Sequence, residues 1–334
     1  MAEIIIDQAT LDSVKGKVVV LAVQVLVASN MVVSIGGAQG IGAATVSQLY
    51  ESGAHVFFGD WDDKRGSKLA EDLTTTSSSS SSSSSGSVTY LKVNVREYQS
   101  LLSLFDTAYD KHGQVDMAIC CAAVTERPGY WEPNKLNLES VRETPTGITD
   151  VIDINLNGTL YFARLAVAYL KEKHNFDTQN TTADNIKSSK CITLVASVAG
   201  FKESPGLFAY SAAKHGVVGL MRALRGFISQ LYGLRVNAIC PWATDTQLLS
   251  GVRDEWTKNN MPMNTPSDVA KYIIQVTADQ TAHGKALFVT GGNAVDIEEG
   301  LNRTEPQWLG EKNSRELNEG QVILGLGMDW GHNK

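Results

Sequence analysis

Short apolar runs rich in β-branched residues alternate along this chain with amphipathic stretches, and this alternation limits the folds that the chain can adopt. The apolar runs predict strands at 55–60, 88–95, 115–123, 190–197, 235–241 and 286–292. The amphipathic stretches predict helices near 41–52, 64–74, 97–112, 149–173, 210–232 and 267–278. Because the strands are continuously apolar, both faces of the sheet must be covered. With right-handed crossovers, the pattern predicts an α/β fold with a doubly wound parallel sheet.

The first strand has two candidates, 17–22 and 31–35, and only the second leads directly into the glycines that follow. Since one strand suffices there, the region near 22–34 is longer than the usual short connection. A genuine insertion and a wrongly translated gene segment both remain open. The same stretch, Val18–Ile35, is barely long enough for a membrane span, contains polar residues and runs into glycines. We therefore interpret it as a buried strand and expect no membrane association.

Residues 1–295 are predicted to form one domain, and three stretches do not fit its core. Residues 74–87 are a serine-rich, low-complexity run, expected to be a disordered surface loop. A second polar loop is expected at 175–189. Residues 296–334 form a C-terminal extension, whose tryptophans and leucines predict that it packs on the domain or on a partner subunit.

The overall charge gives no electrostatic footprint for nucleic acid, because 29 basic residues face 36 acidic ones for a net charge of -7. The four cysteines show neither a CxxC pair nor a histidine at metal spacing, so no metal site is expected. They are interpreted as small buried hydrophobes in a reducing compartment. The start of the chain lacks the pattern of a signal peptide, which adds to the expectation of a cytoplasmic protein.

Gly36, Gly40 and Gly42 follow a predicted strand and open a predicted helix. Glycine lets the backbone approach a pyrophosphate, whose charge is held by the free N–H groups of the helix N-terminus. Alone this signal is weak, and a plain tight turn is the alternative. The next strand ends in Asp60, a carboxylate that accepts hydrogen bonds from ribose hydroxyls and repels the extra phosphate of NADP. Together these residues predict NAD rather than NADP.

Ser197, Tyr210 and Lys214 stand close together in the segment CITLVASVAGFKESPGLFAYSAAKHG. Tyr210 and Lys214 are four residues apart on a predicted helix, so both side chains leave from one face. A phenol with an ordinary pKa of about 10 is a poor base, and a neighbouring ammonium lowers that pKa. The tyrosine can then take a proton from an alcohol as hydride leaves, or donate one in the reverse reduction. Ser197 ends its strand at the carboxyl edge of the sheet, where its hydroxyl can hold the substrate oxygen.

With these residues in place, the chain resembles the short-chain dehydrogenase/reductase family over about residues 15–295. The resemblance implies a Rossmann fold and adds Asn155 to the catalytic residues, where it would hold a water in a proton relay with Lys214. It also matches the segment PWATDT (241–246) to a cofactor motif, in which Thr246 would bind the carboxamide. The cofactor contacts that it implies are Gly36, Gln39, Gly40, Ile41, Gly42, Asp60, Asn94, Val95, Ala122, Tyr210, Lys214, Pro241 and Thr246.

Four departures from the family pattern stand at the cofactor motifs. Ile35 replaces the threonine of the glycine turn, and Asn94 replaces an aspartate at the adenine. The stretch CCAA (120–123) replaces NNAG, and Trp242 replaces the glycine of the PGxxxT segment. Of these, Ile35 and the surplus residues before it bear most directly on cofactor binding.

Three segments, CCAAVTERPGYWEP, FKESPGLFAYSAAKHG and EEGLNRTEPQWLG, resemble fungal secondary-metabolite enzymes, nearest to the 5'-hydroxyaverantin dehydrogenase type and more distantly to 15-hydroxyprostaglandin dehydrogenases. This resemblance implies NAD-dependent oxidation of a secondary alcohol to a ketone, on a bulky, apolar, polyketide-like substrate. Trp242, Leu248 and Trp256 are the candidate substrate contacts, with Trp131 and Met263 beside them. The family also implies a homodimer or homotetramer, paired through the helices at 151–173 and 210–232.

Two alternatives stay open. A ketoreductase would run the same chemistry in reverse with NADH or NADPH, and Asp60 favours NAD and hence oxidation. A catalytically silent member that only binds a ligand is suggested by Ile35 and the surplus residues.

Overall fold

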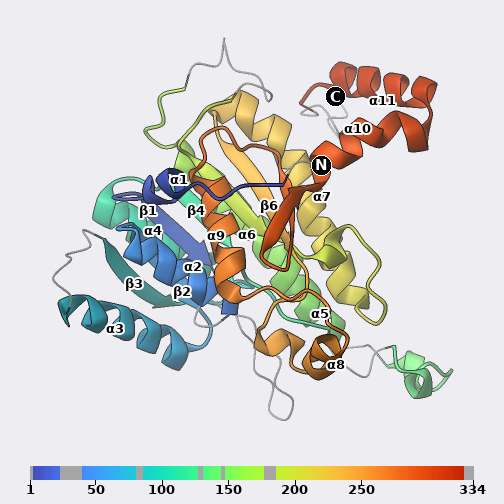
Figure 1. Ribbon diagram of the computed structural model, residues 1–334, viewed down its shortest axis with the longest axis horizontal. Helices are drawn as coiled ribbons and strands as arrows, with labels where there is room; N and C mark the ends of the chain where they lie inside the picture. Colours follow the sequence, from blue (N-terminus) through green and yellow to red (C-terminus); the bar gives the residue numbers. More distant parts are fainter. Residues whose placement is uncertain are drawn as a thin grey trace.

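A sheet of eight strands crosses the protein in the order β3-β2-β1-β4-β5-β6-β7-β8 (Figure 1). The computed structural model describes residues 3–22, 40–79, 86–126, 131–143, 147–176 and 186–326. The strands are β1 (Val18–Ala22), β2 (His55–Asp60), β3 (Ser87–Lys92), β4 (Met117–Cys120), β5 (Cys191–Val195), β6 (Arg235–Pro241), β7 (Ala286–Thr290) and β8 (Asn293–Asp296). Neighbouring strands are parallel except β7 and β8, which are antiparallel. The predicted doubly wound α/β fold is thus confirmed.

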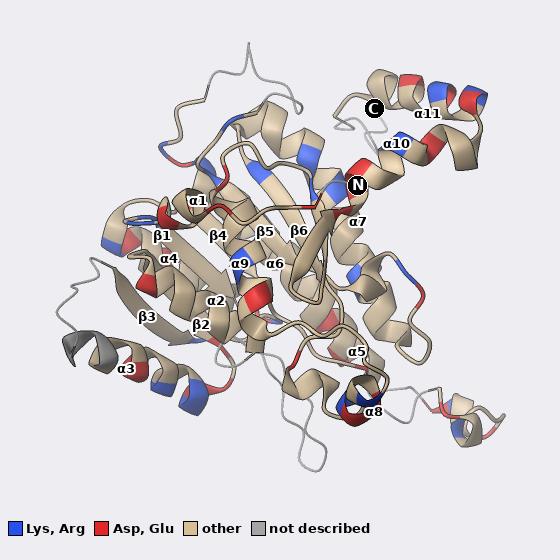
Figure 2. Cartoon of the chain, in the orientation of Figure 1, with Lys and Arg blue, Asp and Glu red and all other residues tan. Residues whose placement is uncertain are grey.

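Helices cover both faces of this sheet. On one face lie α4 (Tyr98–His112), α6 (Gly158–Lys171) and α7 (Phe208–Tyr232), and on the other lie α2 (Gly40–Glu51) and α9 (Pro266–Ala278). The remaining helices are α1 (Gln8–Asp12), α3 (Asp63–Ser79), α5 (Gly147–Ile152), α8 (Arg253–Lys258), α10 (Ile297–Leu309) and α11 (Glu311–Leu324), with short turns η1 (Pro133–Lys135), η2 (Ser140–Arg142), η3 (Asp153–Asn157), η4 (Val198–Gly200) and η5 (Gln247–Leu249). Basic and acidic residues are interspersed over the helices and loops, while the central strands are almost free of them (Figure 2).

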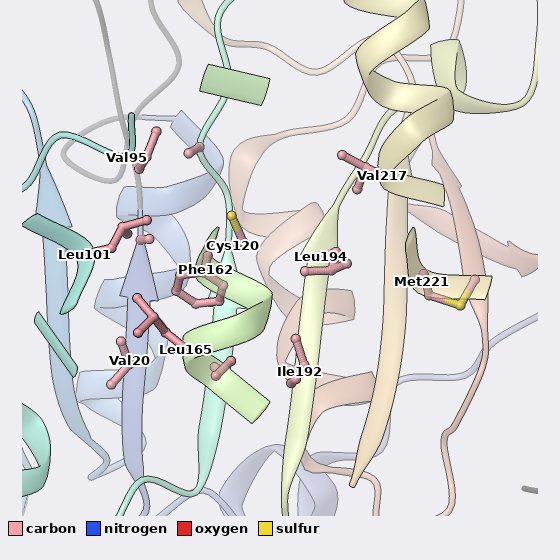
Figure 3. Close-up of a cluster of buried hydrophobic side chains, with 14 of the residues drawn as sticks. Val20, Val95, Leu101, Cys120, Phe162, Leu165, Ile192, Leu194, Val217 and Met221 are labelled. Atoms are coloured by element: carbon pink, nitrogen blue, oxygen red, sulfur yellow. The ribbon is translucent and has the colours of Figure 1, made fainter. Parts of the chain in front are cut away.

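Strand β1 shows why the strand sequences are continuously apolar. Val18 and Val20 belong to the core on the α4, α6 and α7 face, whereas Val19 and Leu21 belong to the core on the α2 and α9 face. Side chains alternate between the faces of a strand, so a sheet covered twice needs apolar residues at every position. Figure 3 shows Val20 beside Phe162 and Leu165 of α6, with Ile192 and Leu194 of β5 in the same layer.

The first strand of the sheet is the earlier of the two candidates. Strand β1 pairs with β2 on one side and β4 on the other, and α2 begins at Gly40. The second candidate, 31–35, lies outside the described residues, as does most of the predicted insertion near 22–34. The connection from β1 to α2 therefore spans residues 23–39, well beyond the usual few residues of such a turn.

Several predicted boundaries were wrong. The serine-rich run was predicted to be a loop from residue 74, but α3 continues through Ser79 and Ser87 already belongs to β3. Strand β3 ends at Lys92, so Asn94 and Val95 follow the strand instead of ending it. The single helix predicted at 149–173 is divided into α5, the π-helical turn η3 and α6. The C-terminal extension forms α10 and α11, which project beyond β8 in Figure 1.

The antiparallel strand β8 was also not predicted. It follows β7 through Gly291 and Gly292, whose φ angles are +55° and +80°. Residues with side chains rarely adopt such angles, so Gly291 and Gly292, predicted to end a strand, instead form a tight hairpin turn. Among the described residues, no helix is both long enough and apolar enough to cross a membrane.

Candidate active site

A cavity of about 230 Å³ opens at the carboxyl edge of the sheet, where β4, β5 and β6 end. This is the edge at which open α/β sheets bind ligands. The lining residues are Ile41, Cys121, Ala123, Val195, Ala196, Ser197, Val198, Ser204, Leu207, Tyr210, Lys214, Pro241, Trp242, Ala243, Thr244, Thr246, Leu248, Leu249 and Trp256. The predicted serine, tyrosine and lysine thus meet in one cavity.

Ser197 lies two residues beyond β5, where the chain turns into η4. Its Oγ accepts a hydrogen bond of 3.2 Å from the backbone N–H of Ala199, which caps that turn. Next in this turn, Gly200 packs against the second turn of α7, since a Cβ at that position would lie 2.7 Å from the Lys214 carbonyl oxygen. The small residue therefore lets the turn that carries Ser197 lie directly against the helix that carries Tyr210 and Lys214.

Tyr210 and Lys214 project from the first two turns of α7 and are both buried. Lys214 Nζ donates a hydrogen bond of 2.9 Å to the carbonyl oxygen of Val195, the last residue of β5. The same nitrogen lies 5.6 Å from the centroid of the Tyr210 ring. The helical spacing thus holds the ammonium next to the phenol, as the sequence predicted.

Burial controls the ionisation of both groups. It raises the pKa of Tyr210, and the hydrogen bond with Ser197 acts in the opposite direction. Burial also lowers the pKa of Lys214 to about 8. The protein alone therefore does not give the lowered tyrosine pKa that the sequence predicted, because loss of solvation outweighs the stabilisation of the phenolate.

Three cysteine thiols lie near enough to Lys214 to influence its pKa. Cys120 and Cys121 belong to the CCAA stretch and Cys240 belongs to β6, and each contributes electrostatically to the pKa of Lys214. Burial raises the pKa of Cys240 to about 12 and also raises the pKa values of Cys120 and Cys121. The thiols therefore stay neutral at ordinary pH and do not compensate the buried positive charge.

Asn155 lies outside the cavity lining but holds one of its borders in place. It is fully buried in the π-helical turn η3, and its amide makes two hydrogen bonds of 2.8 Å with the backbone of Val124, one as donor and one as acceptor. These bonds tie the chain beyond β4 to the start of α6. The side chain of Asn155 is thereby used in fixing the loop that follows β4.

The predicted cofactor residues fall into three groups: those at the cavity, those outside the described residues and those away from the cavity lining. In the first group, Ile41, Pro241 and Thr246 line the cavity with Tyr210 and Lys214, and a Cβ at Gly40 would lie 3.2 Å from Thr246 Cγ2. Gly40 has a φ of +58° and Gly42 is buried in α2, so both the turn and the close packing suit glycine. Gly36 and Gln39 lie outside the described residues.

The third group lies away from the cavity lining. Asp60 is buried at the end of β2, where its Oδ1 accepts a hydrogen bond of 2.9 Å from the Asp62 N–H. Asn94 donates to Glu97 Oε1 at 2.7 Å, so its amide is engaged within its own turn. Val95 and Ala122 are buried, and Val95 packs in the core of Figure 3.

The residues present fit a nicotinamide nucleotide. Within the described residues Lys214 donates to one acceptor, although an ammonium has three N–H donors. A buried donor without a partner is costly, so the remaining N–H groups of Lys214 would donate hydrogen bonds to the hydroxyl oxygens of a bound ligand. Gly40 opens α2 with a φ of +58° and leaves no room for a side chain beside Thr246, which fits the glycine turn before a helix at which such folds bind a pyrophosphate.

The predicted substrate residues Trp242, Leu248 and Trp256 all line the cavity. Trp242 and Trp256 meet edge to face with ring centroids 5.0 Å apart, and Trp256 Nε1 donates to the Pro262 carbonyl at 2.9 Å. Trp131 and Met263 are not among the lining residues; the Trp131 ring contacts Phe208 instead, tilted by 34°.

The sequence analysis missed several residues. Ser204 and Leu207 line the cavity from the loop between η4 and α7, and their position between Ser197 and Tyr210 was a usable signal. Cys121 and Leu249 also line it. Glu126 was missed as well: its carboxylate accepts a hydrogen bond from the backbone N–H of Tyr210, a contact that no local pattern announces.

Doubly wound sheets that open a cavity at the carboxyl edge are the architecture of many nucleotide-dependent enzymes. Residues 30–256 match the short chain dehydrogenase family, and because this match covers more than half of the chain, the protein belongs to that family and is an oxidoreductase. The family uses nicotinamide cofactors and acts on small molecules.

Individual relatives agree with this assignment. A 5'-hydroxyaverantin dehydrogenase of Dothistroma septosporum is 27% identical over 291 residues, 83% of this chain and 88% of that protein. (+)-Borneol dehydrogenase 1 of Salvia officinalis is 28% identical over 278 residues, 78% of this chain and 92% of that protein. The crystal structure of 3-hydroxyacyl-CoA dehydrogenase type-2 from Mycobacterium avium superposes with a TM-score of 0.61 at 24% identity, covering 83% of this chain and 95% of that one. At this identity the structural likeness establishes the fold.

Proposed function

We propose that the protein is an NAD-dependent dehydrogenase that oxidises a secondary alcohol to a ketone on a bulky, apolar substrate. The observation that carries this proposal is a single cavity in which Ser197, Tyr210 and Lys214 lie beneath apolar walls. A hydroxyl, a phenol and an ammonium are the groups that alcohol oxidation needs for orientation, proton transfer and charge.

Each residue has a defined role in the proposed reaction. Ser197 holds the substrate oxygen, and Tyr210 accepts the hydroxyl proton as hydride leaves the adjoining carbon. When bound, NAD supplies the hydride acceptor and the positive charge of its nicotinamide ring. Lys214, whose Nζ lies 5.6 Å from the centroid of the Tyr210 ring, would stabilise the tyrosinate. The hydrogen bond with Ser197 opposes the effect of burial on the pKa of Tyr210. Asn155 lies in η3 and holds the loop after β4 through Val124, and in the proposed reaction it would support a proton relay with Lys214.

Asp60 supports NAD over NADP. It is a buried carboxylate at the end of β2, the position from which such folds contact the adenosine ribose. A second negative charge on a 2'-phosphate would be repelled there. Arg65, the nearby base, forms an ion pair of 3.4 Å with Asp62.

The cavity walls support an apolar substrate. Trp242, Trp256 and Leu248 present hydrophobic surface, and Lys214 is the one charged side chain among the lining residues that the structure describes. Such a cavity suits an uncharged substrate with ring structure. Two relatives are named as dehydrogenases of 5'-hydroxyaverantin and (+)-borneol, which is consistent with a ring-bearing alcohol.

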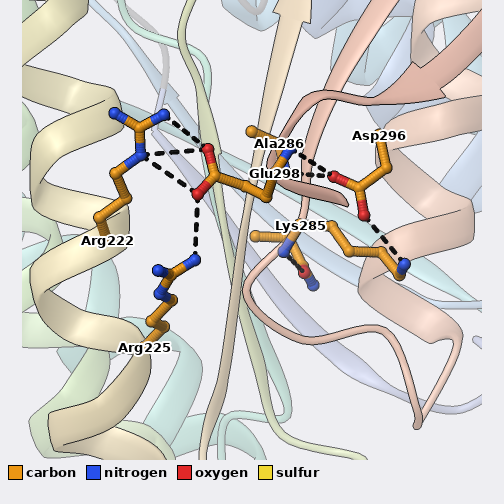
Figure 4. A network of polar contacts seen from close by, with 7 residues as sticks. Arg222, Arg225, Lys285, Ala286, Asp296 and Glu298 are labelled. Atoms are coloured by element: carbon orange, nitrogen blue, oxygen red, sulfur yellow. Dashed lines mark hydrogen bonds and ion pairs between the residues drawn. The ribbon is translucent and has the colours of Figure 1, made fainter. Parts of the chain in front are cut away.

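The organisation of the chain is part of the proposal. Residues 1–295 would form the catalytic domain and 296–334 an extension held to α7 through Glu298. Its buried carboxylate accepts from Arg222 at 2.7 Å and from Arg225 at 3.0 Å, and Lys285 pairs with Asp296 beside it (Figure 4). We also propose pairing of two or four copies through α6 and α7. The four buried, free cysteines support a reducing compartment such as the cytoplasm.

The first test is a fluorescence titration of the purified protein with NADH and NADPH. The proposal predicts tight binding of NADH and much weaker binding of NADPH. Because residues 23–39 separate β1 from α2, failure to bind either cofactor would favour a catalytically silent protein.

The second test is Tyr210→Phe. Loss of the general base is expected to lower kcat by about 10²- to 10⁴-fold while NADH binding is retained. The rate is followed as NADH formation from 1-(2-naphthyl)ethanol, an apolar aromatic secondary alcohol, and from (+)-borneol. Undiminished turnover by the variant would contradict the proposal, and turnover of the ketones with NADPH alone would favour a reductase.

A further inference from the structure

The chain beyond β4 contacts the N-terminal turn of α7 at two points. Glu126 Oε2 accepts a hydrogen bond of 2.9 Å from the backbone N–H of Tyr210. The Trp131 ring packs against Phe208 at a tilt of 34°, with ring centroids 4.9 Å apart. Phe208 is the first residue of α7 and Tyr210 the third, so both contacts reach the turn that carries the phenol.

This helix has no cap of its own. Leu207 occupies the N-cap position without a side-chain hydrogen bond, and the first turn contains no acidic residue. The first N–H groups of a helix lack partners within the helix, and a carboxylate there also interacts favourably with the helix dipole. Glu126, 84 residues away in the chain, fills the place that a neighbouring serine or aspartate normally takes.

The next turn of α7 is fixed by other means. Lys214 is bonded to Val195, and its backbone packs tightly against Gly200. The first turn has less support, because the side chain of Phe208 is 47% exposed. Of the hydrogen bonds to the backbone of this turn in the described residues, the one from Tyr210 to Glu126 reaches outside the helix and its preceding loop.

We propose that Glu126 is a positioning residue for the reaction: its carboxylate holds the first turn of α7 so that the Tyr210 phenol stays beside Ser197. It acts through the backbone of Tyr210, and it is not among the residues that line the cavity. This inference rests on the proposed function. A displacement of about 1 Å at a reacting group can lower a rate by about 100-fold, so a backbone anchor two residues from the start of a helix has a direct catalytic consequence.

Three variants test the inference. Glu126→Ala removes the acceptor, and Glu126→Gln keeps an acceptor oxygen without the charge. Glu132→Ala is the matched control, since Glu132 is an exposed acid of the same segment whose side chain caps nothing. For each we would measure kcat and KM with NAD and 1-(2-naphthyl)ethanol, NADH binding by fluorescence, and Tm.

Glu126→Ala is expected to lower kcat by about 10- to 100-fold, with KM for NAD and NADH binding unchanged. Glu126→Gln is expected to recover most of the rate, and Glu132→Ala to match the wild type. Wild-type kcat in Glu126→Ala would overturn the inference. Equal losses in both Glu126 variants would also overturn it, because the hydrogen bond would then not be the cause; so would a loss of NADH binding.

A measurement without turnover separates this inference from the proposed function. The ionisation of Tyr210 is read from the near-ultraviolet tyrosinate signal, after subtraction of the same titration in a Tyr210→Phe background. If Glu126 holds the phenol beside Ser197, the midpoint of the Tyr210 titration in Glu126→Ala lies at higher pH than in Glu126→Gln. In the alanine variant the phenol moves away from Ser197 and loses the hydrogen bond that lowers the pKa of Tyr210. Equal midpoints in the two variants would overturn the inference, whether or not the wild type oxidises either alcohol. Failure of the wild type to oxidise both alcohols would count against the proposed function instead.

Discussion

Two buried lysines stand at the two ends of strand β5. Lys190 immediately precedes the strand, and its Nζ lies 3.0 Å from Asp116 Oδ1 and 2.7 Å from the Val115 carbonyl oxygen. Lys214 reaches the other end, where its Nζ bonds to Val195, and the described residues give it no carboxylate partner. The ammonium of Lys190 is therefore paired with a carboxylate at one edge of the sheet, whereas the ammonium of Lys214 at the other edge is not.

Arg235 extends the contrast at the amino edge. It is fully buried at the start of β6, and its guanidinium donates to the carbonyl oxygens of Ser188, Val276, Thr277 and Ala282. Lys190 and Arg235 both have their partners within the chain, which is how a protein buries charge for structure. At the carboxyl edge, Lys214 keeps N–H donors without a partner among the described residues and faces a cavity, an arrangement suited to a ligand.

The largest expected effect comes from removing each lysine in turn. Lys214→Met is expected to lower kcat by about 100-fold or more without lowering Tm, because it removes an uncompensated buried charge along with the group that stabilises the tyrosinate. Lys190→Met leaves Asp116 buried without its cation, so it should cost about 3–5 kcal/mol of unfolding free energy. Urea unfolding and kcat per folded molecule measure the two quantities. The contrast would be lost if Lys190→Met lowered kcat as much as Lys214→Met.

An intermediate effect is expected from pH. The pKa of Lys214 is about 8 in the folded protein against 10.5 for an ordinary lysine, so the ammonium is charged below about pH 8 and loses its charge above it. In the ketone-reducing direction kcat/KM should be flat below pH 8 and fall above it, since Lys214 loses its charge and Tyr210 later loses the proton that it donates. A rate that stayed level to pH 9.5 would contradict this assignment.

The same pKa predicts the direction of a change in stability. Between pH 8 and 10.5 the unfolded chain binds more protons at Lys214 than the folded one, so this group makes the free energy of unfolding rise with pH. The rise should be absent from Lys214→Met in parallel urea titrations.

The smallest expected effect concerns the cavity wall. Trp242→Ala should raise KM for 1-(2-naphthyl)ethanol about three- to ten-fold, because an aromatic contact contributes about 0.5–1.5 kcal/mol beyond its buried area. KM for NAD should stay the same. Trp308→Ala is the control, since Trp308 is largely exposed on α10 and does not line the cavity. An equal change in both variants would remove Trp242 from the substrate site.

The sequence was most informative where structure depends on local periodicity. Strands β2 and β6 have the predicted bounds, and the spacing of Tyr210 and Lys214 placed both on one face of α7. It was least informative where composition and local context disagree. The serines at the end of α3 continue a helix that had already begun, and the π-helical turn η3 interrupts a segment of uniform helical pattern.

Apolar pattern, glycines and the interval from Ser197 to Lys214 determined the layered fold, the edge at which the cavity opens and the residues around it. These features follow from side chains near one another in the chain and from the fixed geometry of strands and helices. Only the tertiary structure decided the state of those residues. It placed neutral thiols near Lys214, engaged the Asn94 amide with Glu97, and brought Glu126 to the first turn of α7. Solvation and hydrogen bonding depend on every group that packing brings within a few ångströms, and those groups come from distant parts of the sequence.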